Sequence, residues 1–192
     1  MSLLRLVCPT AAPDSCASTR AASPPAIRRA PRRNSAAAIA FVTLRADEMR
    51  TDIVQSVAIY LRNERLFVCP EAGPGGLLYV IEPIFETSTD ESELESALEQ
   101  GLTASRRTPG RAAPNLRDYK PPILKKVGVK SWNQFARNAS HCSVGRGRDG
   151  WEIQKWRRET DNSFEPQGDP IPLPAGAPVS EAAKLVLDCL RS

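Results

Sequence analysis

The only histidine of the chain, His141, is followed directly by Cys142. Histidine and cysteine are the base and nucleophile of many covalent catalysts, so this pair is the first candidate for chemistry. The surrounding residues predict a β-strand, in which neighbouring side chains point to opposite faces. The two side chains therefore cannot form a catalytic pair with each other, although another cysteine can still approach His141 in space.

The five cysteines, at positions 8, 16, 69, 142 and 189, contain no CxxC spacing. Metal sites need clustered His, Cys or carboxylate side chains at suitable spacings, and the sequence contains no such cluster. An odd number of scattered cysteines is typical of a reducing compartment, where cysteine serves as a small buried hydrophobe. We expect a cytoplasmic protein that uses no metal and no cofactor.

Other catalytic motifs are also missing from the sequence. The segment AGPGG at 72–76 lacks the Lys-Ser/Thr and the helix of a phosphate loop, so it predicts a turn. The acidic pair Asp90-Glu91 precedes a predicted helix, and Ser88 and Glu91 have the spacing of a capping box. We expect a protein without enzymatic activity, while catalysis by carboxylates stays open because it needs no local motif.

Residues 104–130 carry eight Arg and Lys side chains and a single acid, Asp118. Such a run can bind the phosphates of a nucleic acid, with Tyr119 or Trp132 stacking on a base. It can equally be a solvated linker that its own charge keeps extended. A nucleic-acid-binding module is thus the alternative function.

The apolar pattern predicts mainly strands and short helices. Hairpins are expected over 52–70 and 141–156, and the apolar run LLYVIEPIF at 77–85 is expected to be a central strand. Ser131 is expected to cap a short helix that turns Trp132 and Phe135 inward. The proline-bounded segment SFEPQGDPIPLP predicts an edge strand or a strap.

Two amphipathic helices, predicted over 92–102 and 180–190, match each other at an offset of 88 residues. Each helix follows a hairpin, an extended segment and a polar loop, so the order of elements repeats as well. We therefore predict a single α+β domain built from two copies of a hairpin–strand–helix unit around a mostly antiparallel sheet. The half-units are placed at about 52–104 and 124–192, joined by a linker at 105–123.

Residues 1–48 are rich in Ala, Pro, Ser and Arg and show almost no periodic apolar pattern. This composition predicts a disordered tail, or an upstream extension that is not part of the native protein, with Met49 as the true start. The predicted domain is 49–192. No stretch approaches the roughly 20 apolar residues that span a bilayer.

The segments SWNQFARNASHCSV, RDGWEI, IPLP and PVSEAAKLVLDCLRS, together with VAIYLRNERLFV and YVIEP, carry a family resemblance. The region 50–192 resembles CdiI-type immunity proteins of contact-dependent growth inhibition systems, a bacterial family once filed as a domain of unknown function. The long Pro/Arg linker and the N-terminal quarter depart from that family. The resemblance implies no catalytic residue.

The resemblance implies a protein that binds the C-terminal domain of a cognate toxin, often a nuclease, and blocks it. No membrane or small-molecule partner is expected. Glu91, Glu95 and Glu99 recur at four-residue steps and share one outward helix face. They are the candidate partner-binding residues, because an acidic stripe would steer association with a basic toxin. The same stripe is also what ordinary helix solubility requires.

Overall fold

The structure is a computed structural model that describes residues 53–73, 78–105 and 118–192. The predicted tail at 1–48 and most of the predicted linker at 105–123 lie outside these residues. Within the described ranges the chain forms the following elements: β1 (Ile53–Arg62), β2 (Arg65–Ala72), β3 (Tyr79–Val80), β4 (Phe85–Thr87), α1 (Glu91–Ala104), α2 (Pro122–Val127), α3 (Trp132–Ala136), β5 (Ala139–Gly147), β6 (Gly150–Arg158), β7 (Phe164–Pro166), β8 (Ile171–Pro174) and α4 (Val179–Arg191).

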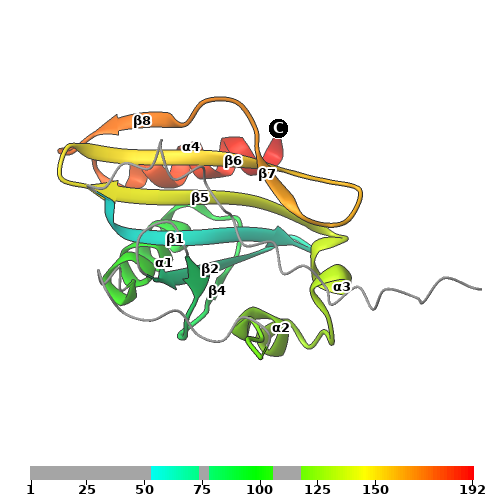
Figure 1. Ribbon diagram of the computed structural model, residues 1–192. Helices are drawn as coiled ribbons and strands as arrows, with labels where there is room; N and C mark the ends of the chain where they lie inside the picture. The colour runs from blue at the N-terminus through cyan, green and yellow to red at the C-terminus, as the bar shows by residue number, and fades with distance from the viewer. Residues whose placement is uncertain (1–52, 74–77, 106–117) are drawn as a thin grey trace, which may run out of the picture. The chain divides into compact units, whose positions relative to one another are not determined.

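The eight strands of the described residues form one antiparallel sheet in the order β3-β2-β1-β5-β6-β7, with β4 beside β2 and β8 beside β6. Figure 1 shows β1 and β5 running side by side through the middle of the sheet. The first hairpin closes through Asn63 and Glu64, which both have positive φ, as a tight two-residue turn requires. The predicted α+β class and both predicted hairpins are confirmed.

Each face of the sheet carries its own apolar core. Successive side chains of β1 point alternately into the two cores. Val57 and Ile59 pack against α1 and α4 on one face, and Ala58 and Tyr60 pack against α2 and α3 on the other. The first core is mainly aliphatic and the second is mainly aromatic. Helices on both faces hold the sheet as one layered body.

The two halves of the chain repeat the same arrangement. Each half contributes a long hairpin, two short strands beside the second hairpin strand, and one helix on the same face of the sheet. At an offset of 85 residues the buried hairpin positions coincide, as the following pairs show: Val57 with Cys142, Ile59 with Val144, Leu66 with Trp151, and Val68 with Ile153. The predicted two-copy unit is therefore present, and its copies share one sheet through β1 and β5.

Two local predictions are wrong. The run at 77–85 forms only the short edge strands β3 and β4, since Pro83 has no N–H to donate to a sheet ladder. Helix α1 is capped by Asp90, whose carboxylate accepts from the N–H groups of Ser92 and Glu93. Ser88 instead donates its N–H and hydroxyl to the Glu93 carboxylate. The capping box therefore does not involve Glu91, which lies too early in the helix to reach back.

Candidate functional site

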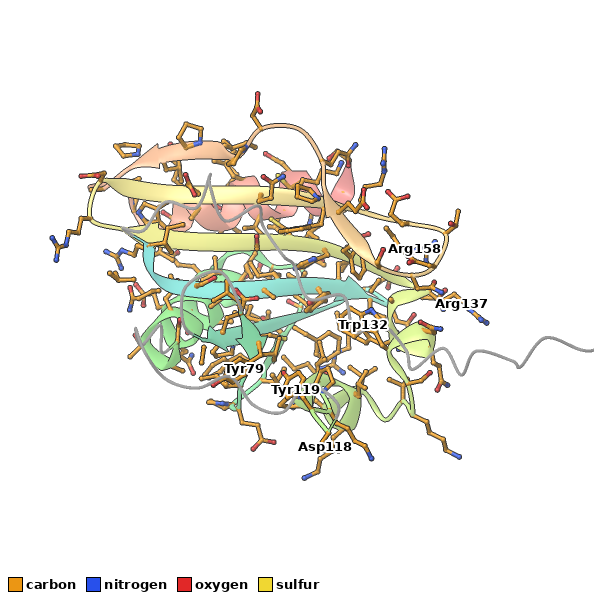
Figure 2. All side chains as sticks on the ribbon, in the orientation of Figure 1. Tyr79, Asp118, Tyr119, Trp132, Arg137 and Arg158 are labelled. Atoms are coloured by element: carbon orange, nitrogen blue, oxygen red, sulfur yellow. The ribbon has the colours of Figure 1, made fainter. Side chains whose placement is uncertain are left out.

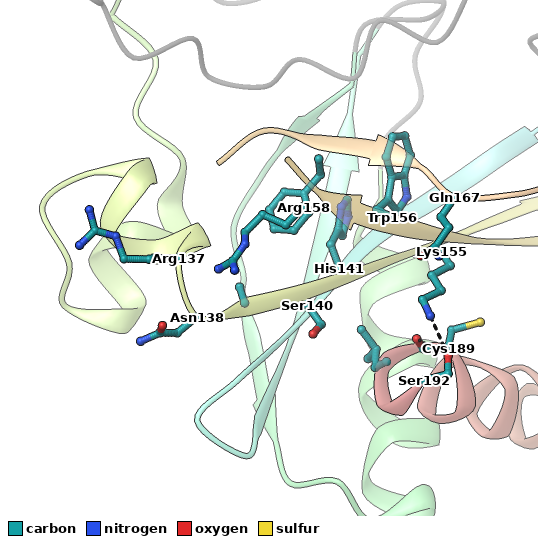
Figure 3. A pocket seen from close by; sticks show the side chains of 13 residues that line it. Arg137, Asn138, Ser140, His141, Lys155, Trp156, Arg158, Gln167, Cys189 and Ser192 are labelled. Carbon is teal, nitrogen blue, oxygen red and sulfur yellow. Dashed lines mark hydrogen bonds between the residues drawn. The ribbon is translucent and has the colours of Figure 1, made fainter. Parts of the chain in front are cut away.

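A cavity of about 450 Å³ opens where β5 and β6 meet the C-terminal end of α4. Figure 3 shows its lining from close by, with β5 and β6 on one side and the last turns of α4 on the other. Its polar lining comes from elements remote in sequence, and it includes Arg137, Asn138, Ser140, Lys155, Arg158 and Ser192. No local sequence pattern predicts this cavity, because only the fold brings residues 137–141 next to residues 189–192.

Within the part of the chain that the structure describes, the cavity is lined by three cationic side chains and by no Asp or Glu side chain. The Lys155 amine donates to the Ser192 hydroxyl at 2.8 Å, next to the C-terminal end of α4. The Arg158 guanidinium donates to the Ala136 carbonyl at 3.1 Å, which ties β6 to the end of α3. These bonds use only part of the donor capacity of the two side chains, so the lining favours contact with carboxylate or phosphate groups.

His141 lies under the cavity within a stack of aromatic rings. Its ring is sandwiched between Tyr60, at 4.5 Å and 15°, and Trp156, at 5.3 Å and 19°, with Phe164 edge-on at 5.1 Å. Neither ring nitrogen has a hydrogen-bond partner among the described residues, and only 4% of the residue is exposed. Burial lowers the pKa of His141 to about 3. The imidazole is therefore neutral near pH 7 and serves as a packing group.

The prediction that His141 and Cys142 face apart is confirmed, since they lie in different cores. The side chain that faces Cys142 is Cys189 of α4. The interaction of the two thiols and burial raise the pKa of Cys142, whereas the same interaction and the Lys155 amine lower the pKa of Cys189 to about 7. The two cysteines are 47 residues apart, so no local sequence pattern predicts this pair.

The predicted partner-binding residues do not line the cavity. Glu91 and Glu99 are exposed on α1 and Glu95 is half-buried, because Leu94 and Leu98, three residues after Glu91 and Glu95, belong to the buried face of the helix. The three carboxylates therefore share one side of the helix, along the border of its buried face. Their role in binding a partner stays a prediction.

The two aromatic side chains that were predicted to stack on bases make contacts within the domain instead. Trp132 is only 7% exposed and donates its indole N–H to the Asn162 carbonyl at 3.1 Å. The Tyr119 hydroxyl donates to the Val80 carbonyl at 2.6 Å, and its ring packs edge-on against Tyr79 at 5.9 Å. Figure 2 shows Tyr79 and Tyr119 lying together beside the sheet. Both aromatic side chains are thus structural, and residues 106–117 of the run lie outside the described residues.

The described residues contain no group of three or more His, Cys, Asp or Glu side chains that could hold a metal ion. No helix in this part of the chain is long and apolar enough to cross a membrane.

No family model matches the chain, and no curated protein matches it. Among solved structures, a protein of unknown function from Neisseria meningitidis has a TM-score of 0.59 at 14% identity, covering 74% of this chain and 97% of its own. A chain of the CdiA-CT/CdiI toxin and immunity complex from Yersinia pseudotuberculosis has a TM-score of 0.54 at 16% identity, covering 73% of this chain and 98% of its own. At such identities the likeness is one of fold, and it links this fold to a toxin and immunity complex.

Proposed function

We propose that this protein is an immunity protein that binds and blocks the toxic C-terminal domain of a cognate contact-dependent growth inhibition toxin. The observation that carries the proposal is the fold shared with a chain of a toxin and immunity complex over 98% of that chain. The family resemblance of residues 50–192 points the same way. The protein would act in the cytoplasm of the cell that it protects.

The architecture suits inhibition by occupancy. A partner that blocks an active site needs a rigid surface, because every side chain or loop that orders on binding weakens the complex. Here one sheet is packed on both faces, by α1 and α4 on one side and by α2 and α3 on the other. Side chains on the outside of these helices are therefore held in fixed positions for a partner.

The acidic side of α1 is the proposed contact surface. A nuclease toxin must hold phosphates and is therefore expected to be basic around its active site. Glu91, Glu95 and Glu99 would attract such a surface and speed its association with the immunity protein. Asp90 and Glu93 at the start of the same helix add to this negative field.

Co-purification tests the proposal. The full chain is expressed with the C-terminal domain of the toxin encoded directly upstream, and the two are expected to co-elute as a one-to-one complex. A cognate domain that elutes separately from the folded protein at micromolar concentration would overturn the proposed function.

The contact surface has its own test. Changing Glu91, Glu95 and Glu99 to Lys is expected to slow association at low salt by about tenfold or more and to flatten its salt dependence. A matched control changes Glu64, Glu165 and Asp169 to Lys, which gives the same change in net charge at three exposed residues outside α1. Equal slowing in both triple variants, measured by stopped-flow, would show that only net charge matters and that α1 is not the contact.

A further inference from the structure

Cys142 and Cys189 form a thiol pair that no part of the proposed function uses. Cys142 lies on β5 and is completely buried, and Cys189 lies on α4 with 7% of the residue exposed. Both belong to the same buried cluster, and each thiol shifts the pKa of the other, while the Cys142 thiol donates to the Ser143 carbonyl at 3.8 Å. The two sulfurs are thus neighbours although 47 residues separate them.

The internal repeat gives independent support for this contact. Cys142 is equivalent to Val57 in the first half, and Cys189 is equivalent to Gly101. A Cβ atom added to Gly101 would lie 3.1 Å from Cγ1 of Val57. The same two positions therefore face each other in both halves, as Val57 and Gly101 in the first half and as two thiols in the second.

The pair is reachable from solvent on one side only. Cys189 lines the 450 Å³ cavity, whereas Cys142 lies behind it in the sheet. Figure 3 shows Cys189 on α4 beside Ser192 and the Lys155 amine. A cation near a thiol favours the thiolate, which is the reactive form of cysteine. A small polar oxidant that enters the cavity would meet Cys189 first.

We propose that Cys142 and Cys189 are a redox modification site at which a hydroperoxide oxidises the pair to an intramolecular disulfide. The Cys189 thiolate attacks one peroxide oxygen, the O–O bond breaks, and hydroxide leaves, which gives a sulfenic acid. The Cys142 thiol, losing its proton, then attacks the Cys189 sulfur and expels the sulfenic oxygen as water. Overall, two thiols and one hydrogen peroxide give one disulfide and two waters.

The thiol acidities suit this order of events. With a pKa of about 7, Cys189 holds roughly tenfold more thiolate at neutral pH than an ordinary thiol does. The pKa of Cys142 is raised, chiefly by its interaction with Cys189, so Cys142 stays protonated until its partner has reacted. Burial raises the pKa of Cys69, which leaves that thiol inert. The disulfide would tie the last turns of α4 to the centre of the sheet.

Peptide mapping of the full chain tests the site. Cys8 and Cys16 are first changed to Ser, so that they cannot compete. After treatment with a stoichiometric amount of hydrogen peroxide, the intact mass is expected to fall by two hydrogen atoms, and a peptide joining Cys142 to Cys189 is expected without reductant. Dithiothreitol should restore the original mass. This result does not depend on toxin binding, so it stands or falls separately from the proposed function.

Two variants separate the roles of the cysteines. Cys142→Ser keeps a hydrogen-bonding group beside Cys189 and removes the second sulfur, and it is expected to leave Cys189 as a sulfenic acid that dimedone traps. Cys189→Ala is expected to prevent any oxidation of Cys142 at the same peroxide dose. Unchanged mass in the parent protein, a disulfide that includes Cys69, or oxidation of Cys189 without a crosslink would each overturn the proposal.

Discussion

At the scale of single residues, packing in the aromatic core determines the protonation state of His141. A neutral imidazole fits between Tyr60 and Trp156 as a flat ring, but both of its nitrogens are left without a partner among the described residues. A protonated ring in that place would be a buried charge with no counter-ion. The residue type most associated with catalysis is therefore a buried and very weak base here, and its charge state is linked to folding.

This linkage predicts acid sensitivity. The ordinary pKa of histidine is about 6.5 and burial lowers that of His141 to about 3, so the unfolded chain takes up a proton over a range in which the folded protein does not. Stability is therefore fully present above pH 6.5 and falls as the pH is lowered toward 3. At pH 4.5 the expected loss in the free energy of unfolding is about 2–3 kcal/mol.

Urea unfolding at pH 7 and pH 4.5 measures this loss. His141→Phe keeps a flat ring in the stack and removes the titrating group, so the variant should lose correspondingly less stability than the wild-type protein between the two pH values. Exposed acids such as Asp90 and Glu93 titrate equally in both proteins and cancel in the comparison. The same pH dependence in both proteins would show that His141 does not carry the effect.

At the scale of elements, α1 lies closer to the sheet than a helix with larger side chains could. A Cβ atom on Gly101 would lie only 2.7 Å from Cγ1 of Val68 and 3.1 Å from Cγ1 of Val57. Valine is stiff at χ1 and cannot easily turn its methyl groups away. The glycine is thus a packing requirement at the point where the helix crosses β1 and β2.

Gly101→Ala is expected to destabilise the protein by about 1–3 kcal/mol, because the strain of overpacking outweighs the better helix propensity of alanine. Gly176→Ala is the matched control, since a Cβ atom there meets nothing within 4 Å. Its stability should change by less than about 0.5 kcal/mol. Thermal or urea unfolding compares the two. Equal stability of the two variants would mean that α1 can move away from the sheet at no cost.

The elements also show what a sequence can predict. Periodicity was sufficient for α1, α4 and both long hairpins, because each buries one regular set of apolar side chains. It failed for the run at 77–85, where apolar composition suggested a central strand and Pro83 allowed only edge pairing. The cavity and the contact of Cys142 with Cys189 depend on how α4 lies on the sheet, and no local pattern encodes that.

At the scale of the whole domain, the two halves depend on each other. The central pairing of β1 with β5 joins them, and Ala58 faces Ser143 at the middle of that pairing. At the 85-residue offset these two residues are equivalent, so the ladder has an approximate two-fold axis between them. Helices α2 and α3 cover the aromatic core next to the first hairpin, while the second hairpin borders the cavity. A symmetric scaffold thus carries two different surfaces.

The proposed function requires that one molecule of this domain bind and inhibit one molecule of the toxin. Titration of the cognate toxin domain with the full chain, at a toxin concentration well above the dissociation constant, measures this ratio. Toxin activity is expected to fall in a straight line and to reach background at one equivalent. Undiminished activity with the folded protein in excess would contradict binding, and full inactivation by a small fraction of an equivalent would reveal a catalyst instead.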